Sequence, residues 1–203
     1  MIVDLSKIGM EKGVQYECII TTLNSENINH AAPIGVLCSG NNTIICRIFK
    51  GSETLENIIS QRKFTVNVTH DPELFLLSTI GNLPVDYFND DNSVKNIDAY
   101  FKCEVEELHE AKKQSDPVRT SYEAIVIKAK VNELIIKKPV KAFNRGFGYV
   151  IESLSNLSRK NIVDDNKKNE YLVNFREARR VVNKIGYKED IIAMNKIKKE
   201  YDD

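Results

Sequence analysis

The spacing of apolar residues changes near Phe143, and this change limits the folds open to the chain. Before it, apolar and polar residues alternate, most clearly in KFTVNVT (residues 63–69), where Phe64, Val66 and Val68 are separated by threonine and asparagine. After it, apolar residues recur every three or four positions, as they do along one side of an α-helix. A β-domain followed by a helical part is therefore expected.

Six segments of the first part are predicted to be strands, because β-branched and aromatic residues dominate them. They are residues 16–23, 30–38, 43–49, 63–69, 99–109 and 121–136. A short helix is expected at residues 53–61, and Asp71 and Pro72 predict the start of another that Gly81 ends. Residues 82–98 have the pattern of an irregular excursion. Six strands with short helices between them are typical of a barrel, so the predicted fold class is mainly β with α.

The second part begins with apolar residues at helical spacing. They are Phe143, Phe147, Val150, Ile151, Leu154 and Leu157. A second helix is expected to end at Gly186, and a third, strongly charged one to lie near residues 190–201. A polar loop, AKKQSDPVRT (residues 111–120), joins the last two strands of the first part. The chain is thus predicted to divide into a barrel, residues 1–140, and a C-terminal helical subdomain, residues 141–203.

Charge and apolar content argue against two classes of partner. Lysine plus arginine and aspartate plus glutamate both number 29 in a chain of 203 residues. The chain therefore lacks the basic excess of a duplex nucleic-acid binder, and no nucleic-acid partner is expected. No segment reaches the ~20 apolar residues of a membrane span, and the N-terminal stretch lacks the apolar core of a signal peptide. A cytoplasmic protein is expected.

The cysteines and histidines do not point to a metal site. The four cysteines are Cys18, Cys38, Cys46 and Cys103, and they form no C-x-x-C pair. We expect buried free thiols, with a disulfide pair as the alternative. The three histidines cluster neither with the cysteines nor with each other along the sequence, so no metal ligands are predicted.

A candidate site appears in ICRIFKGSETL, residues 45–55, where a predicted strand leads into a predicted helix. The start of a helix attracts anions, because its first backbone N–H groups have no partner in the helix. Arg47 and Lys50 add positive charge, Ser52 and Thr54 add hydroxyl groups, and Gly51 lets the backbone come close to a ligand. These are the components of a phosphate site. The alternative is that Ser52 only caps the helix and the cations are solvated.

Two neighbouring segments extend this site toward a flat ligand. In APIG (residues 32–35), Pro33 removes a backbone donor and Gly35 removes a side chain, which leaves a flat strip of backbone. Asn67 lies on the polar side of a third segment, the predicted strand of residues 63–69. A planar heterocycle with a phosphate tail would use all three segments.

The same segments carry a resemblance. AAPIGV, RIFKGSETLEN and KFTVNVTHDP resemble a family of archaeal and bacterial proteins known mainly as a domain of unknown function. That family is similar to the FMN-binding split-barrel superfamily, which includes flavin reductases and pyridoxamine phosphate oxidases. The helical segments FNRGFGYVIESLSNLSR and ARRVVNKIG resemble the C-terminal part of the same family, so the likeness covers nearly the whole chain.

The resemblance implies a split β-barrel of about six strands with short inserted helices and a C-terminal helical appendage. It also implies a homodimer that binds FMN near the subunit interface. The implied cofactor-binding residues are Pro33, Ile34, Gly35, Arg47, Phe49, Lys50, Gly51, Ser52, Thr54 and Asn67. Of these, Arg47, Lys50, Ser52 and Thr54 would hold the phosphate. One departure concerns His30, because a small polar residue such as asparagine is expected just before AAP.

The function that follows is an FMN-dependent oxidoreductase, with a nicotinamide as the candidate electron donor. No catalytic side chain is identified, and the sequence names no substrate. Two alternatives are a non-catalytic FMN-binding or storage module and a sensor of a phosphorylated ligand. Asn144 and Arg145 begin the first C-terminal helix, and they are interpreted either as a cap and a solvated cation or as ligand contacts from a partner subunit.

Overall fold

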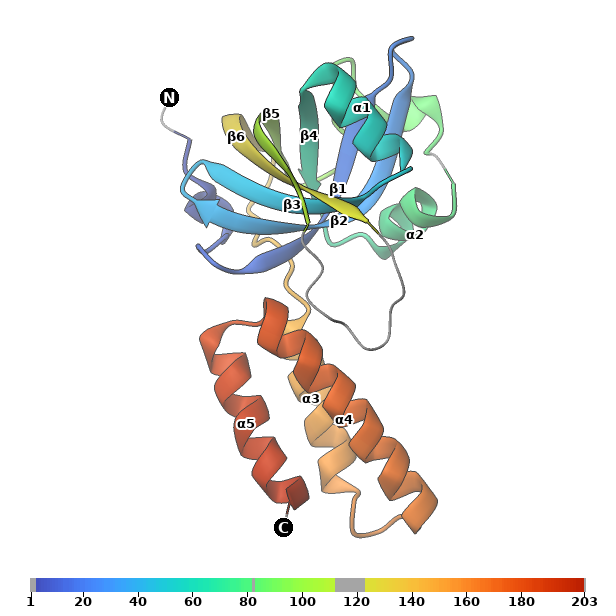
Figure 1. The fold of residues 1–203 in the computed structure, drawn as a ribbon, viewed down its shortest axis with the longest axis vertical. Helices are drawn as coiled ribbons and strands as arrows, with labels where there is room; N and C mark the ends of the chain where they lie inside the picture. Colours follow the sequence, from blue (N-terminus) through green and yellow to red (C-terminus); the bar gives the residue numbers. More distant parts are fainter. Residues whose placement is uncertain (1–2, 82, 112–122, 203) are drawn as a thin grey trace. The chain divides into compact units, whose positions relative to one another are not determined.

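The computed structural model describes residues 3–81, 83–111 and 123–202. The chain forms two compact units, Met1–Phe143 and Asn144–Asp203 (Figure 1). The predicted loop of residues 111–120 lies, apart from residue 111, outside the described residues. Among the helices of the described ranges, none combines the length and the apolar character needed to cross a membrane.

The first unit is a closed barrel of six antiparallel strands, which confirms the predicted fold class and strand number. The strands are β1 (Gln15–Leu23), β2 (Asn29–Gly40), β3 (Thr43–Phe49), β4 (Lys63–Val68), β5 (Ala99–Glu110) and β6 (Ala124–Ile136). They follow one another around the barrel in the order β1-β2-β3-β6-β5-β4. Each of the six predicted strand segments became a strand because a side chain on every second residue faces the barrel interior.

The barrel interior is filled by apolar side chains from all six strands. Examples from each strand are Ile20, Val36, Ile44, Val66, Phe101 and Ile127, all fully buried. All four cysteines are buried and free, as expected from the sequence. Burial raises the pKa of the Cys46 thiol to about 12, so this thiol stays protonated and unreactive at neutral pH.

Two short α-helices begin where the sequence predicts them. In α1 (Glu53–Gln61), Leu55 and Ile58 are buried, and the helix stops at Arg62, which has a left-handed backbone (φ 58°). In α2 (Pro72–Ile80), the Asp71 side chain accepts hydrogen bonds from two backbone N–H groups of the first turn. The described part of this unit also contains two 3-10 helices, Leu5–Ile8 and Val85–Tyr87.

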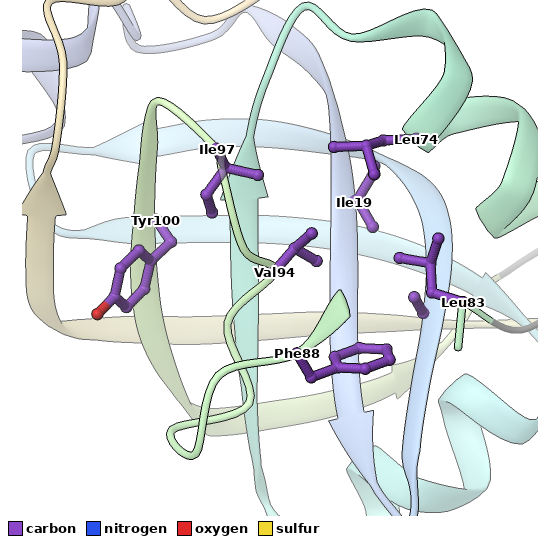
Figure 2. Close-up of a cluster of buried hydrophobic side chains, with 8 residues drawn as sticks. Ile19, Leu74, Leu83, Phe88, Val94, Ile97 and Tyr100 are labelled. Atoms are coloured by element: carbon purple, nitrogen blue, oxygen red, sulfur yellow. The ribbon is translucent and has the colours of Figure 1, made fainter. Parts of the chain in front are cut away.

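The described part of the segment after α2, predicted as an irregular excursion, is irregular, and several of its side chains are buried. This segment and α2 pack on the outer surface of the barrel. Figure 2 shows the apolar cluster that joins them to the strands. The buried members of this cluster are Ile19, Ala31, Leu74, Leu83, Phe88, Val94, Ile97 and Tyr100. A second hydrophobic layer therefore covers this side of the barrel, outside the main core.

The second unit consists of three helices, α3 (Gly146–Ser158), α4 (Asp165–Ile185) and α5 (Lys188–Asp202). Their shared core contains Val150, Phe175, Ala178, Val182, Met194 and Ile197. The helices pack closely at the start of α3, because a Cβ on Gly146 would lie 2.8 Å from Asp190 Oδ2 and 3.0 Å from the Gly186 backbone. The predicted helical period of this part of the chain is confirmed.

Candidate functional site

The predicted site lies where β2 and β3 separate. The two strands are paired only from Val36↔Cys46 to Gly40↔Thr43. Beyond this point β3 stays paired with β6, and the first half of β2 stays paired with β1. Within the described strands, the edge of β2 that includes residues 31–35 thus has no strand partner on the side of β3, so its backbone groups can meet a ligand.

Two of the predicted ligand residues on β3 and two on β2 lie on the outer face of the barrel at this opening. Burial alternates along β3, so Arg47 and Phe49 face outward, and Phe49 is 48% exposed. On β2, Pro33 and Gly35 have the outward parity, and Gly35 would lie across from Arg47 if the pairing continued. A Cβ at position 35 would lie 2.3 Å from the amide nitrogen of Gln15. The flexible end of the Gln15 side chain therefore lies over Gly35.

The backbone turns sharply between β3 and α1, as the sequence suggested. Gly51 has a left-handed backbone, φ 79°, with no atom within 4 Å of the place where a Cβ would lie. Ser52 is the N-cap of α1: its hydroxyl donates to the Phe49 carbonyl at 2.8 Å and accepts from the Leu55 N–H at 3.4 Å. Ser52 is therefore the cap of α1, and its predicted ligand contact would be an additional role.

The two predicted cations have different surroundings. Lys50 contacts two carboxylates, Glu110 at 2.8 Å and Glu123 at 2.6 Å, and their hydrogen bonds raise the pKa of Lys50 to about 12. These partners place the Lys50 ammonium at the ends of β5 and β6. Arg47 is exposed, and within the described part of the chain it makes no hydrogen bond or ion pair. Arg47 is therefore the cation that is available to an anion.

Thr54 is only 2% exposed, and its hydroxyl already has a partner. Thr54 Oγ1 lies 3.0 Å from His30 Nε2, and His30 Nδ1 lies 3.3 Å from Glu53 Oε2. His30 was not among the predicted ligand residues. The signal that could have found it is its position directly before the AAPIG strip, where the resemblance leads one to expect a small polar residue.

Asn67 is fully buried and hydrogen-bonded by the protein itself. Its Nδ2 donates to the Ile19 carbonyl at 3.0 Å and to Thr21 Oγ1 at 3.1 Å, and its Oδ1 accepts from the Val94 N–H at 2.9 Å. The polar face of β4 is therefore covered by the excursion and holds it on the barrel. The predicted ligand role of Asn67 would require these hydrogen bonds to change.

Other features of the described residues lie apart from this site. Two cavities of about 490 Å³ each are lined by residues outside the predicted set. The described ranges contain no cluster of three or more side chains suited to a metal ion.

Asn144 connects the start of α3 to the end of α4. Its Nδ2 donates to the Ile185 carbonyl at 2.6 Å, and its Oδ1 accepts from the Gly146 N–H at 2.7 Å. These hydrogen bonds hold the start of α3, and the interpretation of Asn144 as a ligand contact from a partner subunit stays a prediction.

Two family models match the sequence. Residues 16–133 match the N-terminal domain of a protein of unknown function, DUF447. Residues 144–199 match a second model of the same family. Together the two matches span the barrel and the helical unit.

Individual proteins are also similar to this chain. A crystal structure of an FMN-bound protein, MM1853 from Methanosarcina mazei, is 26% identical, with a TM-score of 0.54, over 97% of this chain and 100% of that chain. The uncharacterized protein MJ1453 from Methanocaldococcus jannaschii is 25% identical over 176 residues, which are 84% of this chain and 90% of that protein. The styrene monooxygenase flavin reductase of Pseudomonas putida S12 is 12% identical, with a TM-score of 0.49, over 62% of this chain and 83% of that chain.

Proposed function

The chain belongs to the DUF447 family of proteins of unknown function, and on this premise we propose that it is an FMN-binding flavoprotein that acts as an oxidoreductase. The observation that carries the proposal is the FMN-bound protein from Methanosarcina mazei, a structure assigned to the same family and similar over nearly the whole of this chain. A homodimer and a nicotinamide electron donor are further parts of the proposal.

The residues at the opening between β2 and β3 fit a flavin mononucleotide. The Arg47 guanidinium can donate two parallel hydrogen bonds to a phosphate, and it has no other partner among the described residues. The open space beside Gly51 admits a ligand at the first turn of α1. Pro33, Ile34 and Gly35 offer the unpaired strand edge to a flat ring.

Each predicted ligand residue is assigned a role on this basis. Arg47, Gly51 and Ser52 would hold the phosphate, and the strip from Pro33 to Gly35, with Phe49, would face the isoalloxazine ring. Lys50 and Thr54 already have partners, so each would exchange a hydrogen bond in order to reach a phosphate. Asn67 would act through the excursion that it holds.

The protein's part in the reaction is to bind and orient the cofactor. Bound FMN supplies hydride or electron transfer. Arg47 and the start of α1 fix the phosphate end, and the β2 edge fixes the ring through backbone groups. The excursion and α2 keep water from the outer face of the barrel beside β2.

The test compares FMN with riboflavin, which lacks the phosphate. Arg47→Ala combined with Ser52→Ala should weaken FMN binding about tenfold or more, since hydrogen bonds to charged groups contribute about 1.5–3 kcal/mol each. Riboflavin binding should change much less. Arg176→Ala, at an exposed position of α4, is the matched control and should leave both affinities unchanged. Equal losses for the two ligands would assign Arg47 and Ser52 to the fold alone.

The proposed reaction has its own test. Purified protein should carry the flavin absorbance near about 450 nm, and NADH or NADPH should bleach it at a catalytic rate. Bound flavin that nicotinamides fail to bleach would favour the non-catalytic FMN-binding module. Protein that rejects FMN would favour the sensor of another phosphorylated ligand. Sedimentation of the purified protein tests the homodimer.

A further inference from the structure

Phe143 lies at the edge of β1 that β4 leaves open. β4 pairs with residues 19–21 of β1, and Phe143 pairs with Glu17 further along the same edge. The Glu17 N–H donates to the Phe143 carbonyl at 2.8 Å, and the Ala142 N–H donates to the Ile8 carbonyl, also at 2.8 Å. The Phe143 side chain is nevertheless 43% exposed. Backbone hydrogen bonds thus fix the position of a large apolar side chain that stays partly uncovered.

Phe143 and Gly35 belong to one cross-strand row on the outer face of the barrel. Glu17 lies opposite Phe143 on one side and opposite Gly35 on the other. Residues directly opposite each other in antiparallel strands have their side chains on the same face of the sheet. Because Tyr16 and Cys18 are fully buried, Glu17 between them faces outward, and so does Phe143. Two strand spacings separate the backbones of Phe143 and Gly35, which is about 10 Å.

The row continues from Gly35 to Arg47. Arg47 would be the next member if the pairing of β2 with β3 continued past Val36↔Cys46. The row therefore has an aromatic ring at one end, a position without a side chain in its middle and a guanidinium at the other end. A ligand with a flat ring system and a phosphate tail has the same order of groups. The flexible end of Gln15, which lies over Gly35, can turn to hydrogen-bond the polar edge of such a ring.

His70 holds the Phe143 ring from one side. His70 lies between β4 and α2, and its ring centroid is 5.8 Å from that of Phe143, with the two planes at 70°. This is the edge-to-face arrangement that aromatic rings prefer. The contact limits the rotation of the Phe143 side chain, and the exposed part of its ring stays available to a second planar group.

We propose that Phe143 is a specificity-determining residue of the flavin site, where its ring contacts the isoalloxazine ring that lies over Gly35. The inference rests on the proposed function. It gives the two ends of the row separate tasks, because Arg47 recognises the phosphate and Phe143 recognises the ring. Contact between the two rings removes apolar surface from water and adds the attraction of a paired aromatic system.

The experiment measures the binding of three ligands to wild type and to Phe143→Ala. FMN has both the ring and the phosphate, riboflavin has only the ring, and ribose 5-phosphate has only the phosphate. FMN and riboflavin should each bind about tenfold more weakly to the variant, because an aromatic contact and its buried area are lost. The affinity for ribose 5-phosphate, measured by competition with FMN, should not change. This pattern is the opposite of the one expected for Arg47→Ala with Ser52→Ala.

The matched control is Phe147→Ala. Phe147 lies four residues further along the chain, on α3, and it is 63% exposed. Its removal takes away an exposed phenyl ring that is outside the row, so the affinities for all three ligands should stay at the wild-type values. An equal loss of flavin affinity in Phe147→Ala and Phe143→Ala would overturn the inference. Circular dichroism checks that each variant is folded.

A spectroscopic measurement separates ring contact from a structural role. The chain contains no tryptophan, so Phe143→Trp introduces a single indole, which quenches flavin emission by electron transfer only at close range. Emission of bound riboflavin should fall severalfold in Phe143→Trp and stay at the wild-type level in Phe147→Trp. Equal emission from the two tryptophan variants, or unchanged riboflavin affinity in Phe143→Ala, would remove the role of Phe143 alone. Wild-type protein that binds neither flavin would instead contradict the proposed function.

Discussion

At the scale of single residues, the backbone angle of Gly51 can be separated from its lack of a side chain. Gly51 and Gly81 both have open space where a Cβ would lie, but Gly51 has φ 79° and Gly81 has the extended φ −179°. Gly51→Ala should lower the free energy of unfolding by about 1 kcal/mol, because an L-residue is strained in the left-handed region. Gly81→Ala should change it by less than about 0.5 kcal/mol. Urea denaturation of both variants makes the comparison, and equal effects would contradict it.

Asn67 offers a second test at the residue scale. Its buried amide makes three hydrogen bonds that hold β4, β1 and the excursion together. Asn67→Ala should lower the free energy of unfolding by about 2–4 kcal/mol, because backbone and hydroxyl groups would be left unpaired in the interior. Asn132→Ala, which removes an exposed hydrogen bond to Glu104, should cost less than about 0.5 kcal/mol. An Asn67 variant with normal stability and weaker FMN binding would instead favour direct contact with the ligand.

The site residues show which parts of the site the sequence could predict. The turn at Gly51 and the cap at Ser52 were predictable, because both depend on neighbours within three residues. The partners of Lys50 were not, because Glu110 and Glu123 lie 60 and 73 residues away along the chain. The contact of His30 with Thr54 spans 24 residues and depends on how α1 packs against β2.

At the scale of elements, the strands were predictable and the role of the excursion was not. Alternating apolar residues define a strand with one buried face, and all six predicted strands formed. The excursion between α2 and β5 has no such period, because its buried apolar residues are irregularly spaced and polar side chains of the strands also hold it. Thr21 donates to the Asn92 carbonyl at 2.5 Å, and Asn29 donates to Asn92 Oδ1 at 2.7 Å. These polar side chains lie on the outer face of their strands, where solvent or a ligand was expected. They bind the excursion instead.

Asp91 makes the attachment of the excursion dependent on pH. Burial alone would raise the pKa of Asp91, but hydrogen bonds from Ser93 and Tyr100 and the nearby Lys102 lower it to about 2. The unfolded value is about 3.9, so ionised Asp91 stabilises the fold above about pH 4, and this contribution disappears as the pH falls toward about 2.

The corresponding variant is Asp91→Asn. It should lower the free energy of unfolding near neutral pH by about 1 kcal/mol, a value reduced for solvent screening because the side chain is partly exposed. The difference from wild type should shrink between about pH 4 and about pH 2. Asp90→Asn, at the exposed neighbouring position, is the control. A difference that stays constant over this range would show that the Asp91 charge has no role.

At the scale of the whole molecule, the chain has two units with separate hydrophobic clusters. We therefore expect a packing defect in one unit to leave the stability of the other unchanged. Gly146→Ala would push a methyl group against Asn144, Asp190 and the Gly186 backbone, at 2.8 to 3.0 Å. The helical unit should lose about 1–3 kcal/mol of stability as a result. Gly148→Ala, two residues further along α3 and with no atom within 4 Å, should instead stabilise the unit by up to about 1 kcal/mol.

Hydrogen exchange measured residue by residue gives the decisive readout, because each unit reports its own stability. In Gly146→Ala, protection should fall in α3, α4 and α5 and stay at the wild-type level in the strands of the barrel. FMN affinity should also stay unchanged, because the proposed contacts of Arg47, Ser52 and the β2 edge all lie in the first unit. A parallel loss of protection in both units would mean that the chain unfolds as one cooperative body. In that case the barrel's stability, and with it the opening between β2 and β3, would depend on the C-terminal helices.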